Sequence, residues 1–438
     1  MEVLRDCLPA SVRRTLKELP ESLDETYERI LKEIKKPNRC LAQRVLHCLV
    51  VAIRPLRVAE LAEVLAVDFD DSKGVPRLNA DWRWEDQEQA LLIACSSLIA
   101  VVENGHSRVV QFSHFSVKEF LTSSRLFTAN GEVSAYRIDL ENAHTILAQA
   151  CLSVLLQTHD EVDGNTSEDH SLAGYAAKHW TTHAQIGEVS SRLQKAMEPL
   201  FDVDKPHFKA WLTLFDIDTR PSFHSTFVSF NMDYTSPAVP LYYAALCGFY
   251  NLVEHLIAKY PRDVNANGGY CMRPLIAALA GEHFQTADLL RHSGADPHIQ
   301  GRSKSIPLHS AVYYENLEVV RKLIEYDSDI DARTEDGWTP LRCASGGLHF
   351  KDGAVLRLLL ERGADVNSRA DDGSTPLYWA SKCGALEVVR LLLEHGADVE
   401  AVSADGKTAL QVLGSGASNK DDPRCEVIRR LLVEHGAK

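Results

Sequence analysis

A spacing of about 33 residues between Pro-Leu pairs is the feature that most constrains how this chain can fold. The pairs begin at Pro240, Pro274, Pro307, Pro340 and Pro376, and Ala409-Leu410 continues the series. The successive gaps are 34, 33, 33, 36 and 33 residues. A fixed period of this length is typical of repeat proteins, whose units stack on their neighbours. The sequence therefore predicts about six units over residues 238–438, which start near 238, 272, 305, 336, 372 and 405.

The unit at 372–400 shows why each repeat forms a pair of helices. Asp372-Gly373 predicts a turn, because Gly accepts a positive φ. Thr375-Pro376 then starts a helix, at a position where the missing N–H of proline is not needed. Leu377 and Ala380 face the neighbouring layer, and the leucines at 391–393 supply the apolar side of a second helix. A glycine at 396 is expected to end that helix in a left-handed conformation.

This pattern resembles the ankyrin repeat, and the resemblance covers about 200 residues, from 238 to 437. It implies an α-solenoid that binds proteins through its hairpin tips and the concave face of its first helices. Mapped onto this chain, the tip position holds Trp338, Ser374 and Lys407, and the first-helix position holds Tyr313, Tyr314 and Lys382. Exposed aromatic residues are good anchors for a partner, but the same aromatics can instead pack between units. Both alternatives stay open at this point.

Some repeats depart from the pattern. Pro261 and Asp327 occupy the position of the helix-ending glycine in the first and third units. Because proline cannot adopt a positive φ, the turn near 261 must differ from the others. Insertions at 349–353 and 414–423 are expected to project from the stack as loops.

The N-terminal part predicts helices followed by a β-hairpin. A capping box at Ser22-Leu-Asp-Glu25 precedes a helix over 22–35, and further helices are expected over 41–53, 58–65 and just before 96. Two β-rich runs, 98–103 and 108–113, are joined through Asn104-Gly105, and Ser116 is expected to cap the helix that follows. We expect an N-terminal helical segment at 1–37 and a winged-helix-like domain at 38–125.

The charge of this region argues against DNA binding. Residues 40–127 contain nine Lys or Arg and eleven Asp or Glu, and the whole chain carries a formal charge of −14. DNA-binding domains usually present a basic face to the phosphates. The most apolar run, at 90–102, is too short to cross a membrane. We therefore expect neither a nucleic acid nor a membrane as partner.

Residues 126–215 predict an all-α connector. Apolar stripes at helical spacing mark 140–156, 171–183, 188–200 and 207–215, and the polar stretch at 158–170 predicts a surface loop. The segment 216–237 is interpreted as a linker into the first repeat.

Four phrases resemble the region just downstream of a NACHT module in fungal NACHT–ankyrin proteins, which are STAND-type proteins similar in plan to NOD-like receptors. They are the phrases at 19–27, 54–61, 112–121 and 175–183. The resemblance implies a winged helix that helps to hold a nucleotide switch closed, and repeats that sense a partner. The sequence given lacks the nucleotide-binding part, so the resemblance does not carry ATPase or GTPase activity over to it.

Motifs that suggest chemistry have simpler explanations here. The stretch Ala401-Val-Ser-Ala-Asp-Gly-Lys-Thr408 satisfies a relaxed phosphate-loop pattern, but it aligns with the repeat turns at 336–339 and 372–375. His179 and His183 could share one helix face, yet no third ligand accompanies them, and a structural role beside Trp180 is favoured. The ten cysteines include no Cys-x-x-Cys pair and predict buried, reduced thiols. We expect no catalytic site, no cofactor, no metal and no small-molecule substrate.

The leading hypothesis is a non-enzymatic scaffold or sensor protein, cytoplasmic or possibly nuclear, that binds a protein partner through its ankyrin repeats. The first alternative is the sensing half of a NACHT-type, nucleotide-switched receptor. A weaker alternative is a DNA-binding regulator that uses the winged helix. The sequence leaves the identity of the partner and the oligomeric state open.

Overall fold

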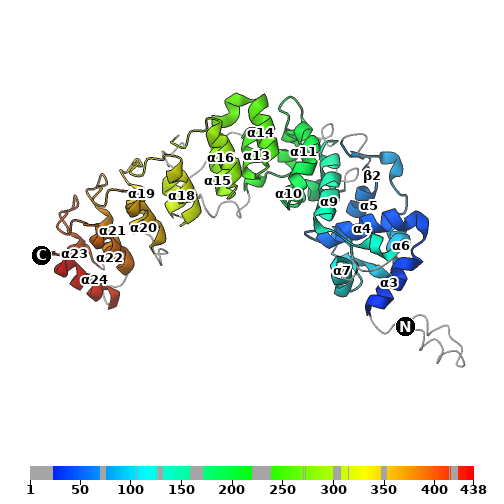
Figure 1. Cartoon of the computed structure of the whole chain (residues 1–438), viewed down its shortest axis with the longest axis horizontal. Helices are drawn as coiled ribbons and strands as arrows, with labels where there is room; N and C mark the ends of the chain where they lie inside the picture. Colours follow the sequence, from blue (N-terminus) through cyan, green and yellow to red (C-terminus); the bar gives the residue numbers. More distant parts are fainter. Residues whose placement is uncertain are drawn as a thin grey trace, which may run out of the picture. The chain divides into compact units, whose positions relative to one another are not determined.

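The computed structural model divides the chain into two compact units, residues 1–217 and 218–438, and Figure 1 labels most of their helices. It describes residues 23–69, 75–105, 107–124, 126, 132–157, 171–219, 238–269, 271, 273–298, 307–313, 315–346, 353–413, 415 and 423–438. The capping serine at 22, the loop at 158–170, and most of the linker and of both insertions lie outside these ranges. The finer domain boundaries drawn from the sequence remain predictions.

The first unit begins with the helices that the sequence predicts. Their bounds are α3 (Leu23–Glu33), α4 (Arg39–Val51), α5 (Val58–Leu65), α6 (Gln87–Cys95) and α7 (Phe115–Thr122). Each of the first four buries a leucine almost completely, namely Leu31, Leu46, Leu61 and Leu91. Burial of these apolar side chains against one another is the main force that holds the helices together.

A three-stranded antiparallel sheet completes the winged helix. Its strands are β1 (Leu56–Arg57), β4 (Ile99–Asn104) and β5 (Ser107–Phe112), in the order β1-β5-β4, with Val110 opposite both Leu56 and Val101. Gly105 adopts a φ of +60° in the turn between β4 and β5, which confirms the hairpin predicted there. A separate two-stranded ribbon pairs β2 (Val67–Asp68) with β3 (Arg77–Leu78).

The cap of α7 differs from the prediction. His114 is the N-cap residue, and its Nδ1 accepts a hydrogen bond from the backbone N–H of Ser116 at 3.3 Å. Ser116 instead lies in the first turn of the helix, where its Oγ is 2.7 Å from the Tyr27 hydroxyl. The assignment of the cap to Ser116 was therefore wrong. A histidine ring nitrogen can accept a hydrogen bond from a backbone N–H of the first turn, as a serine hydroxyl does.

The predicted helical connector consists of α9 (Leu140–Leu155), α10 (Ala173–Ala184), α11 (Val189–Leu200) and α12 (His207–Leu214). Helix α9 packs against both α4 and α10. An aromatic cluster lies between α10 and α12, where the rings of Trp180 and Trp211 are 5.3 Å apart and Trp211 Nε1 donates to the carbonyl of Ala177 at 3.0 Å. The cluster gives the connector a core of its own.

In the second unit, the described helices form six successive pairs. The pairs are α13 (Pro240–Leu246) with α14 (Tyr250–Lys259), α15 (Pro274–Ala280) with α16 (Phe284–His292), α17 (Pro307–Tyr313) with α18 (Leu317–Glu325), α19 (Pro340–Ser345) with α20 (Ala354–Glu361), α21 (Pro376–Cys383) with α22 (Leu386–Glu394), and α23 (Ala409–Val412) with α24 (Pro423–Glu434). The first helices pack against each other in four places, α13 on α15, α17 on α19, α19 on α21 and α21 on α23. The second and third pairs are joined by Tyr326, whose hydroxyl donates to Asp288 at 2.6 Å. This arrangement confirms the predicted stack of helix pairs (Figure 1).

The turn residues act as the sequence pattern predicts. The hydroxyls of Thr339, Thr375 and Thr408 each accept the backbone N–H of the residue three positions on, at 3.3, 3.3 and 3.4 Å. Asn367 ties two repeats together, because its Oδ1 accepts the N–H of Asp398 at 2.8 Å and its Nδ2 donates to the carbonyl of Gly396 at 3.3 Å. Local caps and bonds between neighbours thus define each unit.

The irregular repeats also follow the prediction. Gly396 ends α22 with a φ of +84°, and Asp327 adopts a φ of +60° at the equivalent place after α18. Pro261 instead begins a short 3-10 helix, Pro261–Asn265. The turn near 261 therefore differs from the others, as the fixed φ of proline requires.

Candidate functional site

The structure places the predicted partner-binding residues in different environments. Tyr313, at the end of α17, is 51% exposed, and Lys407 is exposed in the turn before α23. Trp338 and Lys382 are half-buried. Tyr314 lies outside the described residues.

Ser374 requires a correction, because only 1% of it is exposed. Its backbone N–H donates to Asp372 Oδ1 at 2.9 Å, and its hydroxyl donates to the same oxygen. The hydroxyl also accepts a bond of 2.8 Å from Trp379 Nε1. A small side chain that completes the Asp-Gly turn has no surface left for a partner, so Ser374 is not an exposed tip residue.

Two of the predicted residues meet in one cluster around a residue that the sequence did not reveal. The guanidinium carbon of Arg342 lies 3.5 Å from the ring centre of Trp338 and 4.2 Å from that of Trp379. Lys382 Nζ lies 4.3 Å from the centre of the same Trp379 ring. We call these four residues the tryptophan–arginine cluster. It joins the hairpin and first helix of the fourth repeat to the first helix of the fifth.

Arg342 is 5% exposed, and neither its Nε nor its Nη2 has a hydrogen-bond partner among the described residues. Burial lowers the pKa of Arg342. The stacked indoles supply cation–π attraction, which offsets part of the loss of water around the charge. The cluster therefore holds a buried cation, two of whose three nitrogens have no hydrogen-bond partner among the described residues.

The signal for Arg342 in the sequence lies in the repeat alignment. The equivalent position in the first, second, third and fifth repeats is buried, and it holds Tyr242, Ile276, His309 and Tyr378. His309 uses the position to donate through Nε2 to the carbonyl of Trp338 in the next repeat, at 2.8 Å. An arginine at a position that other repeats bury with Ile, Tyr or His is the anomaly that would have marked the site.

The stretch that matches a phosphate-loop pattern is a repeat turn, as its alignment predicts. Gly406 has a φ of +72°, and Lys407 pairs with Asp405 at 3.3 Å. The hydroxyl of Thr408 caps α23, and Oε1 of Gln411 accepts a hydrogen bond of 3.0 Å from the backbone N–H of Thr408. The groups that would hold a phosphate and its metal are therefore engaged in the turn.

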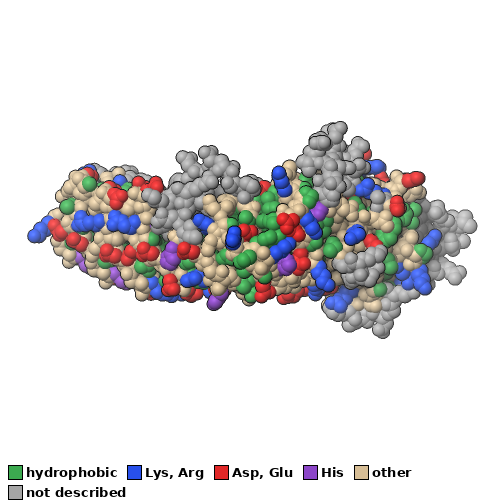
Figure 2. Space-filling model, turned by 90° about the horizontal axis from the view of Figure 1, so that it is seen from above, with side chains coloured by type: hydrophobic (Ala, Val, Ile, Leu, Met, Phe, Trp, Pro, Cys, Tyr) green, Lys and Arg blue, Asp and Glu red, His purple; other side chains and the backbone are tan. Residues whose placement is uncertain are grey.

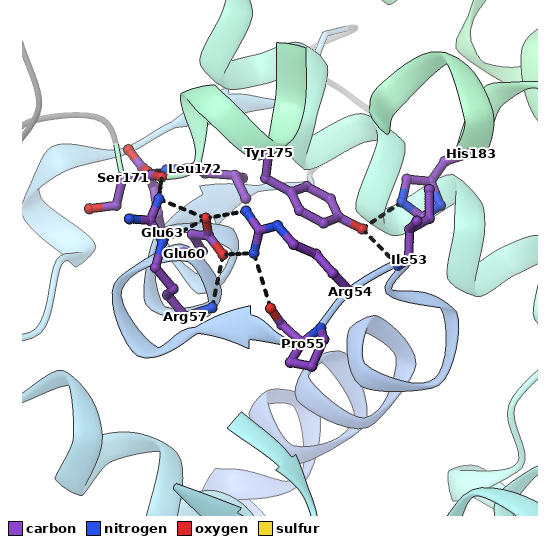
Figure 3. Close-up of polar contacts among 10 residues, drawn as sticks. All are labelled: Ile53, Arg54, Pro55, Arg57, Glu60, Glu63, Ser171, Leu172, Tyr175 and His183. Carbon is purple, nitrogen blue, oxygen red and sulfur yellow. Dashed lines mark hydrogen bonds and ion pairs between the residues drawn. The ribbon is translucent and has the colours of Figure 1, made fainter. Parts of the chain in front are cut away.

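A second polar site lies in the first unit, around the fully buried carboxylate of Glu60 (Figure 3). Arg54 donates two bonds to it, at 2.6 and 2.8 Å, and Arg57 donates through its backbone N–H at 2.8 Å and through Nε at 2.9 Å. Burial alone would raise the pKa of Glu60, but the bonds from Arg54 and Arg57 outweigh it and hold that pKa below its ordinary value.

The same region joins the winged helix to α10 of the connector (Figure 3). The hydroxyl of Tyr175 accepts the backbone N–H of Ile53 at 3.3 Å, and the Arg54 guanidinium lies 5.0 Å from the Tyr175 ring centre. Glu63 accepts the backbone N–H of Leu172. Two of the phrases that carry the NACHT resemblance, at 54–61 and 175–183, therefore meet in space. The sequence identified both phrases but gave no sign of their contact.

His183 is buried beside Tyr175 and His144. Its Nε2 is 2.9 Å from the Tyr175 hydroxyl, and its Nδ1 is 2.8 Å from Nδ1 of His144. Burial lowers the pKa of His183 to about 3, so the ring is neutral at physiological pH. Across the part of the chain that the structure describes, no group of three or more His, Cys, Asp or Glu side chains is placed to hold a metal ion. The contacts of His183 are those of a structural residue.

The second helices of the repeats present balanced charge. Glu387 pairs with Arg390 at 3.9 Å, and Glu426 pairs with Arg429 and Arg430 at 3.6 and 3.5 Å. In Figure 2, basic side chains run beside acidic ones near the C-terminal end of the chain, at the left. Paired charges of this kind create no strong field of one sign. Within the described ranges, no helix combines the length and the apolar character that a membrane crossing requires.

Comparison with known proteins assigns both parts of the chain. Residues 275–370 and 347–438 match a family model described as ankyrin repeats in three copies, and residues 27–151 match one described as the winged helix domain of GPI inositol-deacylase.

Relatives match over part of their length. The chain is 30% identical over 299 residues to the azaphilone pigments biosynthesis cluster protein L of Monascus ruber, which covers 64% of this chain and 61% of that protein. It is 39% identical over 106 residues to ankyrin repeat and SOCS box protein 5 of Mus musculus, which covers 24% and 32%. The chain thus spans less than two thirds of either relative. The solved ankyrin repeat domain of Bcl-3 aligns with 27% identity and a TM-score of 0.40, over 47% of this chain and 89% of that one.

The chain therefore contains a winged helix domain and a helical connector followed by an ankyrin-repeat α-solenoid, and the repeats indicate a role in protein interaction.

Proposed function

We propose that this chain is a non-enzymatic scaffold or sensor of the cytoplasm or nucleus that binds a protein partner through the hairpins and first helices of its ankyrin repeats. The observation that carries the proposal is the tryptophan–arginine cluster, in which Trp338 and Lys382 meet around Arg342. Tyr313 and Lys407 extend the proposed surface to the third and sixth repeats.

Physical reasons favour this side of the repeats over the second helices. Tryptophan, tyrosine and arginine bury much area for little lost side-chain freedom, so they dominate the binding energy of many interfaces. On the second helices, by contrast, charges such as Arg390 and Glu387 already pair with each other. Exposed pairs of this kind contribute little to stability and leave little charge for a partner.

The experiment compares variants of the full chain as baits for proteins in a cell extract of the source organism. Trp338→Ala and Tyr313→Ala should reduce capture of the bound partner, while circular dichroism shows that the repeats remain folded. Tyr250→Ala is the matched control, because Tyr250 is 41% exposed on a second helix, α14. Equal capture by all three variants would refute the proposed face.

A second candidate is the sensing half of a NACHT-type, nucleotide-switched receptor. Two findings support it: the match of residues 27–151 to a winged helix domain, and the contact between the phrases at 54–61 and 175–183 through Arg54 and Tyr175. Such a contact would let a movement of the winged helix reach the connector. Sequencing the gene on the 5′ side of the codon for Met1 tests this candidate. An in-frame phosphate loop of the form Gly-x-x-x-x-Gly-Lys-Ser/Thr would support it, and its absence would count against it.

DNA binding remains the weaker alternative. Helix α6 (Gln87–Cys95) precedes the wing, and its sequence contains Glu88 and no Lys or Arg. Filter binding of the full chain to duplex DNA at about 0.15 M salt tests this alternative, and retention there would revive it.

A further inference from the structure

The second helices of the ankyrin repeats share a charge pattern that the fourth repeat breaks. In α18 and α22, an exposed glutamate pairs with the arginine three residues further on. The pairs are Glu318 with Arg321 and Glu387 with Arg390, both at 3.9 Å. Pairs of this kind on one helical turn contribute little to stability, but they neutralise the arginine.

Arg357 of α20 is the exception. It stands six residues before the left-handed Gly363, just as Arg390 stands six residues before Gly396. The position three residues before Arg357 holds Ala354 and not a glutamate. Arg357 is exposed, and among the residues that the structure describes it forms no ion pair. Its charge is therefore left for another group to neutralise.

A surface groove of about 310 Å³ lies between α18 and α20 at this point, and we call it the α18–α20 groove. Ala354 lines it together with Leu317 and Leu358. Leu358 is 5% exposed and Leu317 is half-buried, so these side chains form an apolar floor. Pockets for small molecules begin at about 300 Å³, so the groove suits a single side chain. A glutamate in place of Ala354 would occupy part of this space.

The charged side chains around the groove are mainly basic. They are three arginines and one glutamate, namely Arg321, Arg357, Arg362 and Glu361. Arg357 and Arg362 are exposed, so an anion can reach their guanidinium groups from solvent. The whole chain has a formal charge of −14, but at about 0.15 M salt charges are screened beyond about 8 Å. The charges at the groove itself therefore decide what it attracts.

Exposed carboxylates on the flanking helices restrict the ligand further. Glu318 and Glu325 lie on α18, and Glu387 lies on α22. An acidic segment would meet these carboxylates on either side of the groove and be repelled. A segment with one carboxylate and basic residues around it complements both the groove and its surroundings.

We propose that the α18–α20 groove binds one glutamate side chain of a partner protein, in a segment whose neighbouring residues are lysine or arginine. The carboxylate pairs with Arg357 and Arg362, and the stem of the side chain lies on Leu317 and Leu358. The partner thus supplies the glutamate that α18 and α22 carry within their own sequence. This site goes beyond the proposed function, because it lies on the second helices and not on the hairpins and first helices.

The test uses a defined probe and the full chain. Peptides of 13 residues with a fixed central glutamate and random flanks are displayed on phage and selected on the wild type. Selected peptides are synthesised with a fluorescent label, with the central residue as Glu, Gln or phosphoserine. Fluorescence polarisation then measures the Kd of each peptide for the wild type and its variants.

The decisive variant is Ala354→Glu. It restores the glutamate that the flanking repeats have and occupies the groove, so it removes the site without removing any packing. Ala354 is the first residue of α20, and a glutamate is favourable at a helix N-terminus. We therefore expect this variant to fold, and thermal unfolding followed by circular dichroism verifies it.

Two matched controls separate the site from a general effect of charge. Val427→Glu places a glutamate three residues before Arg430, but Arg430 already pairs with Glu426 at 3.5 Å, and Val427 is 40% exposed. Arg390→Gln makes the same change as Arg357→Gln in a repeat that has its own glutamate. Both controls should bind the peptides as the wild type does.

The change of the central Glu to Gln should weaken binding to the wild type about three- to tenfold. This range lies between the effect of an exposed ion pair and that of a buried one. Ala354→Glu should weaken binding of the Glu peptide by at least as much. In Arg357→Gln, the difference between the Glu and Gln peptides should shrink to less than about twofold, because one partner of the pair is gone. The selected flanks should be enriched in lysine and arginine.

Several results would overturn the inference. Equal binding of the Glu and Gln peptides to the wild type, or undiminished binding to Ala354→Glu, would show that no glutamate enters the groove. A selection that returns no peptide, or only peptides with acidic flanks, would contradict the proposed ligand. Tighter binding of the phosphoserine peptide by tenfold or more would assign the groove to a phosphate instead. Trp338→Ala should leave peptide binding unchanged, so failure of the proposed function and failure of this site are distinguishable.

Discussion

Replacement of Glu60 by Gln tests whether the buried carboxylate holds the winged helix and the connector together. Glu60 has no exposed surface, and it accepts four hydrogen bonds from Arg54 and Arg57. Gln preserves the shape but removes the charge, and its amide N–H groups must face the guanidinium donors. Loss of one partner of a buried ion pair costs about 3–5 kcal/mol. Arg54 and Arg57 are 40% and 47% exposed and can regain water, so we expect a loss of about 2–3 kcal/mol.

Hydrogen exchange of the full chain, followed by mass spectrometry, measures this loss locally. Amides in α5 and at the start of α10 should exchange about 30- to 160-fold faster in Glu60→Gln, which is the factor that 2–3 kcal/mol corresponds to. Amides in α22 of the second unit should be unchanged. Glu85→Gln is the control, because Glu85 is an exposed carboxylate of the same unit. A loss below about 0.5 kcal/mol, the range of ordinary surface substitutions, would refute the reasoning.

The pH dependence supplies an independent check with a definite sign. The folded-state pKa of Glu60 lies below its ordinary value. The unfolded state therefore binds the proton first, and the stabilisation is complete above the unfolded pKa of about 4.3. It is lost as the pH falls through the folded pKa. The difference between wild type and Glu60→Gln should be largest at neutral pH and shrink below about pH 4. A difference that stays constant down to pH 3 would contradict this assignment.

Further predictions concern four single sites. Arg342→Met should leave the free energy of unfolding within about 1 kcal/mol of wild type or raise it. The variant loses the cation–π contacts but no longer buries N–H donors without a partner. A larger loss of stability in urea unfolding would contradict this prediction. Asp327→Gly should raise stability by about 0.5–1 kcal/mol, since Asp327 has a φ of +60°, and Gly396→Ala at +84° should lower it similarly in thermal unfolding. The folded-state pKa of His183 is about 3, so as the pH falls the unfolded chain binds a proton at this histidine before the folded chain does. The free energy of unfolding should therefore fall by about 2 kcal/mol from pH 6.5 to pH 5. A thermal melting profile in which His183→Gln keeps the same slope over this range would contradict that account.

The local structure of this protein can be predicted from short stretches of its sequence. Three of these features depend only on backbone angles within a few residues. They are the Pro-Leu period, the left-handed glycines and the Thr caps at 339, 375 and 408. The exception at Pro261 was predictable for the same reason, because its φ is fixed by its own ring. The hairpin at Asn104-Gly105 belongs to this class as well.

Tertiary structure alone decided which side chains meet. Ser374 is buried because its own turn and Trp379 engage the hydroxyl, and Arg342 is enclosed because two tryptophans from neighbouring repeats stack on it. Tyr175 reaches the backbone of Ile53 across 122 positions of sequence. No local pattern encodes such contacts, since they depend on how helices pack and on which buried polar group finds a partner. The period of the repeats therefore predicted a binding scaffold, whereas only packing showed the buried guanidinium of Arg342 within it.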